Sequence, residues 1–211
     1  MSAEHPPVPD FSLIETMRLD EGRIVRRDRH LSRARTSAHT LGTGWQDAAI
    51  HAALDAALDA HRAGVWRLRL LVSMAGDPSV TCTAFTHDRD RVWRVTLAQD
   101  PVASSDLALR HKTTRRGVYE RAAQSGFDDV LLWNERGEIT ESTIANVAAE
   151  LDGVGVTPPL DSGLLPGVFR AALLESGELR ERVITKADLA LASRLWLINS
   201  LREWVPASLV Q

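Results

Sequence analysis

The run His111-Lys112-Thr113-Thr114-Arg115-Arg116 is the most informative stretch of this 211-residue chain, because it holds one of only two lysines, the other being Lys186. Arginine supplies the rest of the Lys and Arg charge and can replace lysine at most surface positions. It cannot form a Schiff base with a carbonyl compound, so a retained lysine is a candidate for covalent chemistry. Lys112 follows an apolar stretch and precedes a predicted helix, where mixed chains tend to place reactive groups. The alternative is a lysine at a helix start that points into water.

Composition narrows the class of protein. Hydrophobic residues at 44% and charged residues at 25% are typical of a globular protein, and a net charge of −3 gives no reason to expect nucleic acid or an anionic membrane as partner. The single Cys82 excludes an intrachain disulfide and favours the cytoplasm. No apolar run approaches the roughly 18–20 residues of a membrane span, and residues 1–10 lack the apolar core of a secretory signal. The seven histidines show no metal-ligand spacing, so no metal site is expected.

Apolar periodicity and turn residues predict strands and helices in both halves of the chain. The predicted strands cover 11–19, 23–25, 65–73, 80–86, 92–98, 129–133, 138–140, 146–151, 154–157, 183–185 and 194–198. The predicted helices cover 28–41 (with Asp28 as N-cap), 45–62, 114–125, a segment from Pro166-Gly167 to Glu175, and a short turn from Lys186.

Residues 99–110 lack a clear period and are interpreted as the connection between the two halves. A small N-terminal subdomain at 1–103 and a larger, cofactor-binding C-terminal subdomain at 104–211 follow from that interpretation. Because strands and helices do not alternate regularly, the sequence predicts an α+β fold in two subdomains.

Three places could bind a phosphate group. Pro166-Gly167 opens a helix, where the free N–H groups of Val168 and Phe169 would face an anion. Asn199-Ser200-Leu201 follows an apolar strand and could present a hydroxyl and backbone N–H groups, while Arg33 could supply charge. An ordinary helix start and an ordinary turn remain the alternatives. No glycine-rich nucleotide loop is present.

Glu141 lies between Gly137-Glu138-Ile139-Thr140 and Ser142-Thr143-Ile144-Ala145-Asn146, a stretch too small and apolar for a charged loop tip. A carboxylate in such surroundings needs a partner, unless it ends a strand that faces solvent. One chemistry combines a lysine, a carboxylate and a phosphate cradle without a metal, and that chemistry is pyridoxal phosphate catalysis.

Several blocks of the sequence resemble the class IV aminotransferase-fold enzymes in their order and rough spacing from about Phe11 to Ala207. Within the family, the chain is most similar to the 4-amino-4-deoxychorismate lyases, especially the form often fused behind aminodeoxychorismate synthase component I. The blocks are Phe11-Ser12-Leu13-Ile14-Glu15-Thr16-Met17-Arg18, His30-Leu31-Ser32-Arg33, His111-Lys112-Thr113-Thr114, Asn134-Glu135-Arg136-Gly137-Glu138-Ile139-Thr140-Glu141, Leu164-Leu165-Pro166-Gly167 and Asn199-Ser200-Leu201-Arg202.

The resemblance implies a fold-type IV pyridoxal 5'-phosphate enzyme, with two α/β subdomains, the cofactor in the cleft between them, and an active site shared across a homodimer. It implies that Lys112 forms the Schiff base, that Glu141 holds the pyridine nitrogen and that Arg33 binds the phosphate. The remaining implied contacts are backbone groups of Val168, Phe169, Ser200 and Leu201 at the phosphate, Ile144 and Ala145 at the ring, and Arg69 and Tyr119 towards the substrate.

The implied reaction converts 4-amino-4-deoxychorismate to 4-aminobenzoate and pyruvate for folate biosynthesis, with aminodeoxychorismate synthase as a possible partner. Transamination of a D- or branched-chain amino acid is the first alternative, because the same site residues serve both reactions. An inactive cofactor-binding homologue is the second, suggested by an N-terminal subdomain that is shorter at its start than in many members. Arg115 stands where lyases often have asparagine, and Met74 where an arginine commonly follows the strand.

Overall fold

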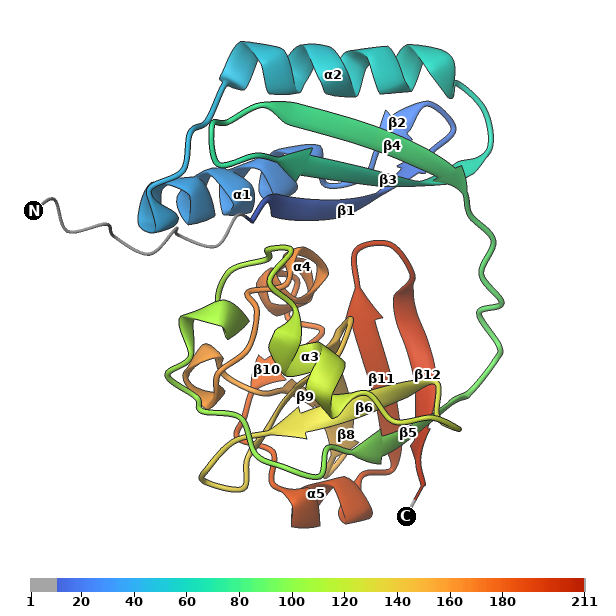
Figure 1. Cartoon of the computed structure of the whole chain (residues 1–211). Coiled ribbons are helices and arrows are strands. Elements are labelled where there is room, and N and C mark those ends of the chain that lie inside the picture. The colour runs from blue at the N-terminus through green and yellow to red at the C-terminus, as the bar shows by residue number, and fades with distance from the viewer. Residues whose placement is uncertain (1–10, 211) are drawn as a thin grey trace, which may run out of the picture.

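The computed structural model describes residues 11–210 and places two bodies one above the other (Figure 1). Residues 1–10, for which the sequence predicts no secretory signal, lie outside this range. The upper body is a four-stranded sheet in the order β2-β1-β3-β4, with its two helices on one face. Its elements are β1 (Leu13–Asp20), β2 (Arg23–Ile24), α1 (Arg27–Leu41), α2 (Asp47–Ala60), β3 (Val65–Val72) and β4 (Pro78–Ala84).

Alternation along the strands of the upper sheet separates a core face from a face that looks towards the lower body. Leu13, Met17 and Leu19 of β1 pack with Leu68 and Leu70 of β3 beneath the helices. The residues between them therefore point the other way, because side chains alternate along a strand. Those intervening positions include Ile14, Thr16, Arg67 and Arg69, and all four line the cavity between the bodies.

The lower body is an eight-stranded sheet in the order β10-β9-β8-β11-β12-β5-β6-β7, which closes because β7 also pairs with β8. A closed sheet has no free edge among the strands of the ring, and its inward side chains fill the interior. Its strands are β5 (Trp93–Leu97), β6 (Asp129–Trp133), β7 (Ile139–Ser142), β8 (Asn146–Leu151), β9 (Val154–Thr157), β10 (Arg180–Glu181), β11 (Arg194–Asn199) and β12 (Glu203–Leu209).

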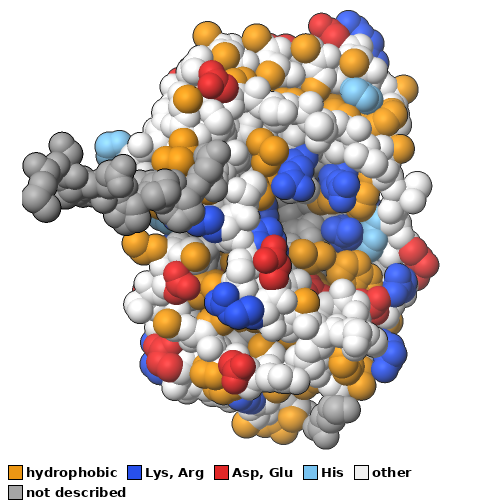
Figure 2. Space-filling view, viewed as in Figure 1, with side chains coloured by type: hydrophobic (Ala, Val, Ile, Leu, Met, Phe, Trp, Pro, Cys, Tyr) orange, Lys and Arg blue, Asp and Glu red, His pale blue; other side chains and the backbone are white. Residues whose placement is uncertain are grey.

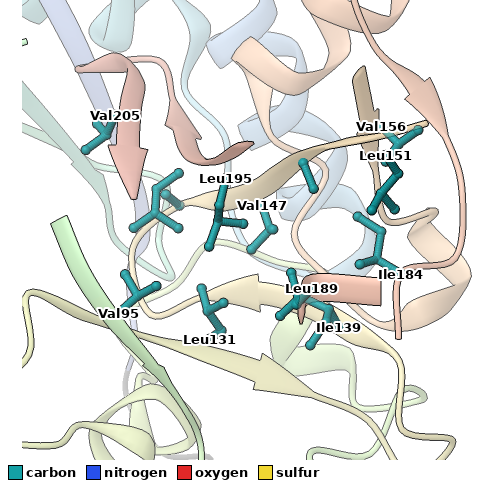
Figure 3. Close-up of a cluster of buried hydrophobic side chains, with 13 residues drawn as sticks. Val95, Leu131, Ile139, Val147, Leu151, Val156, Ile184, Leu189, Leu195 and Val205 are labelled. Carbon is teal, nitrogen blue, oxygen red and sulfur yellow. The ribbon is translucent and has the colours of Figure 1, made fainter. Parts of the chain in front are cut away.

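Aliphatic side chains form the core of the lower body (Figure 3). Val95, Leu131, Val147, Leu197 and Val205 come from five different strands and are each at most 2% exposed. The helices and 3₁₀ turns around the barrel are η1 (Leu107–Leu109), α3 (Gly117–Ala122), η2 (Leu160–Ser162), α4 (Val168–Glu175) and α5 (Lys186–Leu191). No helix within residues 11–210 is long and apolar enough to cross a membrane.

The structure confirms the mixed α+β fold but moves the connection between the two halves. The predicted boundary after residue 103 is wrong, because β5 pairs with β6 and β12 and so belongs to the second sheet. The chain crosses from one body to the other between β4 and β5, over residues 85–92 (Figure 1). Sequence periodicity could not show this, since β5 resembles the strands before it and its partners lie far along the chain.

Other differences are local. Helix α1 begins at Arg27 with Arg26 as its N-cap, so Asp28 lies in the first turn and is not the cap. Helix α3 is shorter than the predicted 114–125, because Lys112 O accepts a hydrogen bond from Ile14 N and Thr114 N donates to Ser12 O. The predicted strand 183–185 is absent and β10 lies just before it. Strand β12, which follows Arg202, was missed.

We expect Leu54→Ala in α2 to lower the free energy of unfolding by about 2–5 kcal/mol, since Leu54 is fully buried between the helices and the upper sheet. Asp59→Ala on the exposed face of the same helix removes only a surface ion pair with Arg62, so its effect should stay below about 1 kcal/mol. Urea unfolding of the two variants measures the difference. Equal effects would contradict the packing described for α2.

Candidate active site

A cavity of about 300 Å³ lies between the two bodies and is lined by residues of both. Figure 2 shows Lys and Arg side chains gathered around a hollow at this level of the molecule. The upper body contributes residues of β1, α1 and β3, and the lower body contributes the segment around Lys112, the β7–β8 turn, the start of α4 and the β11–β12 turn. The site therefore depends on the relative position of two separately packed cores.

Lys112 lines this cavity, so the structure places it away from the solvent-facing position that was its alternative. Its backbone is fixed against the start of β1, since Lys112 O accepts from Ile14 N at 2.8 Å and Thr113 bridges to Leu13. Burial, aided by the charges of Arg33 and Arg116, lowers the pKa of Lys112 to about 8, although Glu15 and Glu141 oppose the shift. An amine with this pKa is neutral for an appreciable part of the time near neutral pH, as a base or nucleophile requires.

Glu141, at 3% exposure, lies on β7 and lines the same cavity. Tyr119 Oη donates to Oε1 at 2.7 Å, and Leu165 N and Asn146 Nδ2 donate to Oε2 at 3.2 and 3.4 Å. Burial raises the pKa of Glu141 to about 7, although these hydrogen bonds and the charge of Lys112 oppose the shift. The solvent-facing strand end that sequence left open for Glu141 is thereby excluded.

Tyr119 was predicted to face the substrate, and it does line the cavity. Its hydroxyl is committed to Glu141, and the Arg116 guanidinium lies 4.4 Å from the centre of its ring. Burial, followed by the charge of Glu141, raises the pKa of Tyr119, so the hydroxyl stays protonated and acts as a donor. The structure thus assigns Tyr119 a place beside Glu141, where it orients the carboxylate.

Arg33, which also lines the cavity, is held by a buried carboxylate that sequence reasoning missed. Glu15 accepts from Arg33 Nε at 2.9 Å and from Arg33 Nη2 at 2.5 Å, and from His30 Nδ1 at 2.6 Å. Burial alone would raise the pKa of Glu15, but the charges and hydrogen bonds of Arg33 and His30 outweigh it and hold the pKa at about 2. The signal was present in the sequence, because Glu15 alternates with Leu13 and Met17 on the core face of β1.

The start of α4 presents the free backbone donors that the sequence predicted. Gly167 precedes the helix and lines the cavity together with Val168, whereas the predicted Phe169 does not line it and packs its side chain against Trp204. A Cβ on Gly167 would lie 1.8 Å from Asn146 Oδ1, which explains why glycine stands there. The first N–H groups of a helix have no intrahelical acceptor and attract anions.

The turn after β11 brings Ser200 and Leu201 to the same end of the cavity. Ser200 Oγ lies 2.8 Å from His30 Nε2, so the serine continues the hydrogen-bond chain from Glu15. Leu201 N donates to Asn199 Oδ1 at 3.1 Å, so this predicted phosphate donor already has a protein acceptor. Ile144 and Ala145, predicted to lie at the ring, line the cavity beside Glu141, and Arg69 lines it from the upper sheet.

The donor set fits pyridoxal phosphate. Arg33 and the free N–H groups at the start of α4 suit a phosphate, and Lys112 and the buried Glu141 suit an aldehyde-bearing ring with a basic nitrogen. Among residues 11–210, no three His, Cys, Asp or Glu side chains gather into a metal-binding group.

Comparison with known proteins agrees with this arrangement. The model of the family described as "Amino-transferase class IV" matches residues 12–210, which is nearly the whole chain. The chain belongs to the class IV aminotransferase family. It is therefore an enzyme of that family with the fold-type IV architecture, and pyridoxal phosphate is the cofactor of the family.

Individual relatives of this class IV chain carry different names. A Schizosaccharomyces pombe protein named "Putative aminodeoxychorismate lyase" is 31% identical over 206 residues, covering 92% of this chain and 87% of that protein. A crystal structure of a "Putative amino-acid aminotransferase" from Mesorhizobium loti is 44% identical, with a TM-score of 0.89, and covers 95% of this chain and 100% of that one. A Methanocaldococcus jannaschii protein named "Putative branched-chain-amino-acid aminotransferase" is 27% identical, and the match covers 68% of this chain and 54% of that protein.

The raised pKa of Glu141 predicts a pH dependence of stability in the cofactor-free protein. Between its ordinary pKa of 4.5 and about 7, the folded state holds a proton on Glu141 that the unfolded state has lost, so this group makes the protein less stable as pH rises. In the Glu141→Gln variant this decrease of stability with rising pH is absent. Its stability relative to wild type should therefore rise by up to about 3 kcal/mol between pH 4.5 and 7 and stay level above that.

Glu15→Gln is the control of opposite sign. The pKa of Glu15 is lowered to about 2, so its stabilisation is present above pH 4.5 and disappears as pH falls towards 2. The Glu15→Gln variant should therefore lose stability relative to wild type as pH rises from about 2 to 4.5. Urea unfolding of all three proteins from about pH 2 to above about pH 7 measures both differences, and parallel pH curves for Glu141→Gln and wild type would contradict the buried environment of Glu141.

Proposed function

We propose that this class IV enzyme is a lyase that converts 4-amino-4-deoxychorismate to 4-aminobenzoate and pyruvate. The cofactor chemistry in the proposal is supported by the placement of Lys112 and Glu141 on one cavity, each with a pKa moved towards neutrality. The choice of substrate is supported by the similarity to the Schizosaccharomyces pombe protein, which extends over nearly the whole of both chains.

The residues that would hold the cofactor lie along the length of the cavity. Arg33, fixed by Glu15, and the N–H groups of Val168, Phe169 and Ser200 would bind the phosphate. Glu141 would hold a proton on the ring nitrogen, and Lys112 would form the covalent link to the aldehyde carbon. When bound, pyridoxal phosphate accepts the electron pair that is released at the carbon bearing the substrate amine.

Lys112 has two tasks in this proposal. Once the substrate amine has displaced it, its neutral amine removes the proton from the carbon that bears the amine, for which a pKa near 8 is suited. The ether bond to the neighbouring enolpyruvyl group then breaks, the ring becomes aromatic, and Lys112 returns a proton to the departing group, which leaves as pyruvate. Tyr119 and Leu165 N–H keep the carboxylate of Glu141 in place throughout.

Transamination is the second candidate, favoured by the 44% identity to the Mesorhizobium loti protein and its name. It uses the same lysine and carboxylate, so the cofactor end of the cavity serves both reactions. It differs in needing an amino donor and a keto acid acceptor. The proposal further includes a homodimer, as the family resemblance implies, and a cytoplasmic location, which the single Cys82 favours. Aminodeoxychorismate synthase is a possible supplier of substrate.

We expect Lys112→Ala to abolish the covalent attachment of pyridoxal phosphate, and Lys186→Ala to leave it intact. Lys186 lies on α5 against the ring of Trp133 and does not line the cavity, and it is the only other lysine in the chain. Borohydride reduction of the loaded protein, followed by peptide mass spectrometry, should find the cofactor on the peptide containing Lys112. A label on Lys186, or a label retained in Lys112→Ala, would remove Lys112 from its assigned role.

We expect the purified, cofactor-loaded protein to form pyruvate and 4-aminobenzoate in equal amounts from 4-amino-4-deoxychorismate without an added keto acid. Lys112→Ala should lower this rate by at least about 1000-fold, since both proton transfers depend on it. Enzymatic assay of pyruvate and chromatography of 4-aminobenzoate measure the two products. Amino transfer that requires a keto acid, with no pyruvate formed, would establish the aminotransferase, and cofactor binding without either activity would leave an inactive homologue.

A further inference from the structure

The cavity holds more positive charge than a cofactor phosphate needs. Besides Arg33 and Lys112, which face the proposed cofactor, the cavity wall includes Arg67, Arg69, Arg115, Arg116 and Arg202. Glu141 is the only acidic side chain in the described lining. Cations gathered in a cleft repel one another and attract anions, so this wall indicates an anionic occupant beyond the phosphate.

Two of these arginines, Arg67 and Arg69, come from the cavity face of β3. Both side chains are exposed, and neither forms an ion pair or a side-chain hydrogen bond within residues 11–210. On the neighbouring strand β1, Thr16 lies opposite Arg69 and Arg18 lies opposite Arg67. The nearby Asp20 is bound by Arg18 Nε at 2.8 Å, so it does not neutralise Arg67.

Arg202 reaches the same wall from the turn between β11 and β12. Its guanidinium carbon lies near two aromatic rings, 5.4 Å from the centre of the Phe85 ring and 5.3 Å from that of Trp93. The adjacent Glu203 is used elsewhere, since it pairs with Arg26 at 2.9 Å and lies 3.9 Å from Arg89. The rings hold the guanidinium in position without neutralising it, because cation–π contacts leave its charge unpaired.

Arg67 and Arg202 act on each other electrostatically. Burial, followed by the positive charge of Arg67, lowers the pKa of Arg202, and Asp129 opposes the shift. The Asp129 carboxylate itself is bound by the hydroxyl of Thr143 at 2.5 Å. Arg67 and Arg202 therefore lie close enough on the cavity wall to repel one another, and Asp129, whose Oδ2 has no hydrogen-bond partner among the described residues, offsets only part of the charge of Arg202.

The two remaining arginines of the wall have other contacts. Arg116 donates to Thr143 O and packs over the ring of Tyr119, which places it at the Glu141 end of the cavity. Arg115 packs over the ring of Phe11, with 4.3 Å from its guanidinium carbon to the ring centre. These contacts separate Arg115 and Arg116 from the cluster formed by Arg67, Arg69 and Arg202.

We propose that Arg67, Arg69 and Arg202 form a carboxylate-binding subsite that makes the enzyme selective for small dicarboxylate substrates. The inference rests on the proposed function and deepens it, because 4-amino-4-deoxychorismate carries two carboxylates. Arginine binds a carboxylate through two parallel hydrogen bonds, which fixes orientation as well as charge. A branched-chain amino acid has one carboxylate and an apolar side chain, and would leave this subsite unpaired.

The test measures binding, not turnover. The holoenzyme is titrated calorimetrically with isophthalate, a rigid dicarboxylate, and with benzoate, its single-carboxylate counterpart. We expect isophthalate to bind at least about tenfold more tightly than benzoate, and Arg67→Gln and Arg202→Gln each to weaken isophthalate binding about tenfold. Arg62→Gln, which removes an exposed arginine of the upper body that is paired with Asp59, should bind as wild type does.

Charge and geometry are separated by Arg67→Lys, which keeps the charge but loses the two-pronged hydrogen bonding, and which should give an intermediate affinity. Unchanged cofactor absorbance shows that each variant keeps its fold and its cofactor. Equal affinity for isophthalate and benzoate, or wild-type affinity in Arg67→Gln and Arg202→Gln, would overturn the subsite.

The subsite and the lyase reaction can fail separately. Selective isophthalate binding that depends on Arg67 and Arg202, in an enzyme that releases no pyruvate, would support the subsite and refute the lyase. Pyruvate release from 4-amino-4-deoxychorismate at the same kcat/KM in wild type, Arg67→Gln and Arg202→Gln would support the lyase and refute the subsite.

Discussion

The buried carboxylate of Glu15 is the constraint on which the cavity depends. It lies on the core face of β1, where an unpaired charge would be costly, and it is stabilised by Arg33 and His30 of α1. Both partners also reach the lower body: Arg33 Nη1 donates to Pro166 O at 3.2 Å, and His30 Nε2 lies 2.8 Å from Ser200 Oγ. One ionised group thus fixes Arg33 and His30 at the cavity and links the two separate hydrophobic cores.

The same arrangement helps to explain the pKa of Lys112, which is lowered to about 8. Arg33 is the residue that we propose to bind the phosphate, and its positive charge lowers the pKa of the nearby Lys112, while the negative charge of Glu15 limits the fall. An isolated Arg33 would depress the pKa of Lys112 further, and a missing Arg33 would let it rise. Because Glu15 both orients Arg33 and offsets its charge, anion binding and lysine reactivity are coupled through a side chain that touches neither the anion nor the substrate.

Local sequence signals predicted most elements, because apolar alternation and turn residues act within a few positions. Strands β6, β8 and β9 and helix α4 matched their predicted bounds. These local signals failed where strands far along the chain determine which sheet a strand joins. Strand β5 joins the second sheet through β6 and β12, and β12 itself was missed. The predicted site residues included Lys112, Glu141 and Arg33, whereas Glu15, Arg67 and Arg202 were recognised only when the strands were paired and their faces assigned.

The residues proposed to hold the cofactor and the arginines proposed to bind substrate bear on different questions: the first on the cofactor chemistry, the second on the substrate. Lys112, Glu141 and the α4 start supply what both a lyase and an aminotransferase require, so they identify the cofactor chemistry and nothing finer. Arg67, Arg69 and Arg202 line the cavity from β3 and the β11–β12 turn, and none of the three is among the side chains that hydrogen-bond Glu15. Arginines whose charge the protein leaves unpaired there make an apolar substrate unfavourable and an acidic one favourable. We therefore infer the substrate class from these arginine charges, which no acidic side chain within residues 11–210 pairs with.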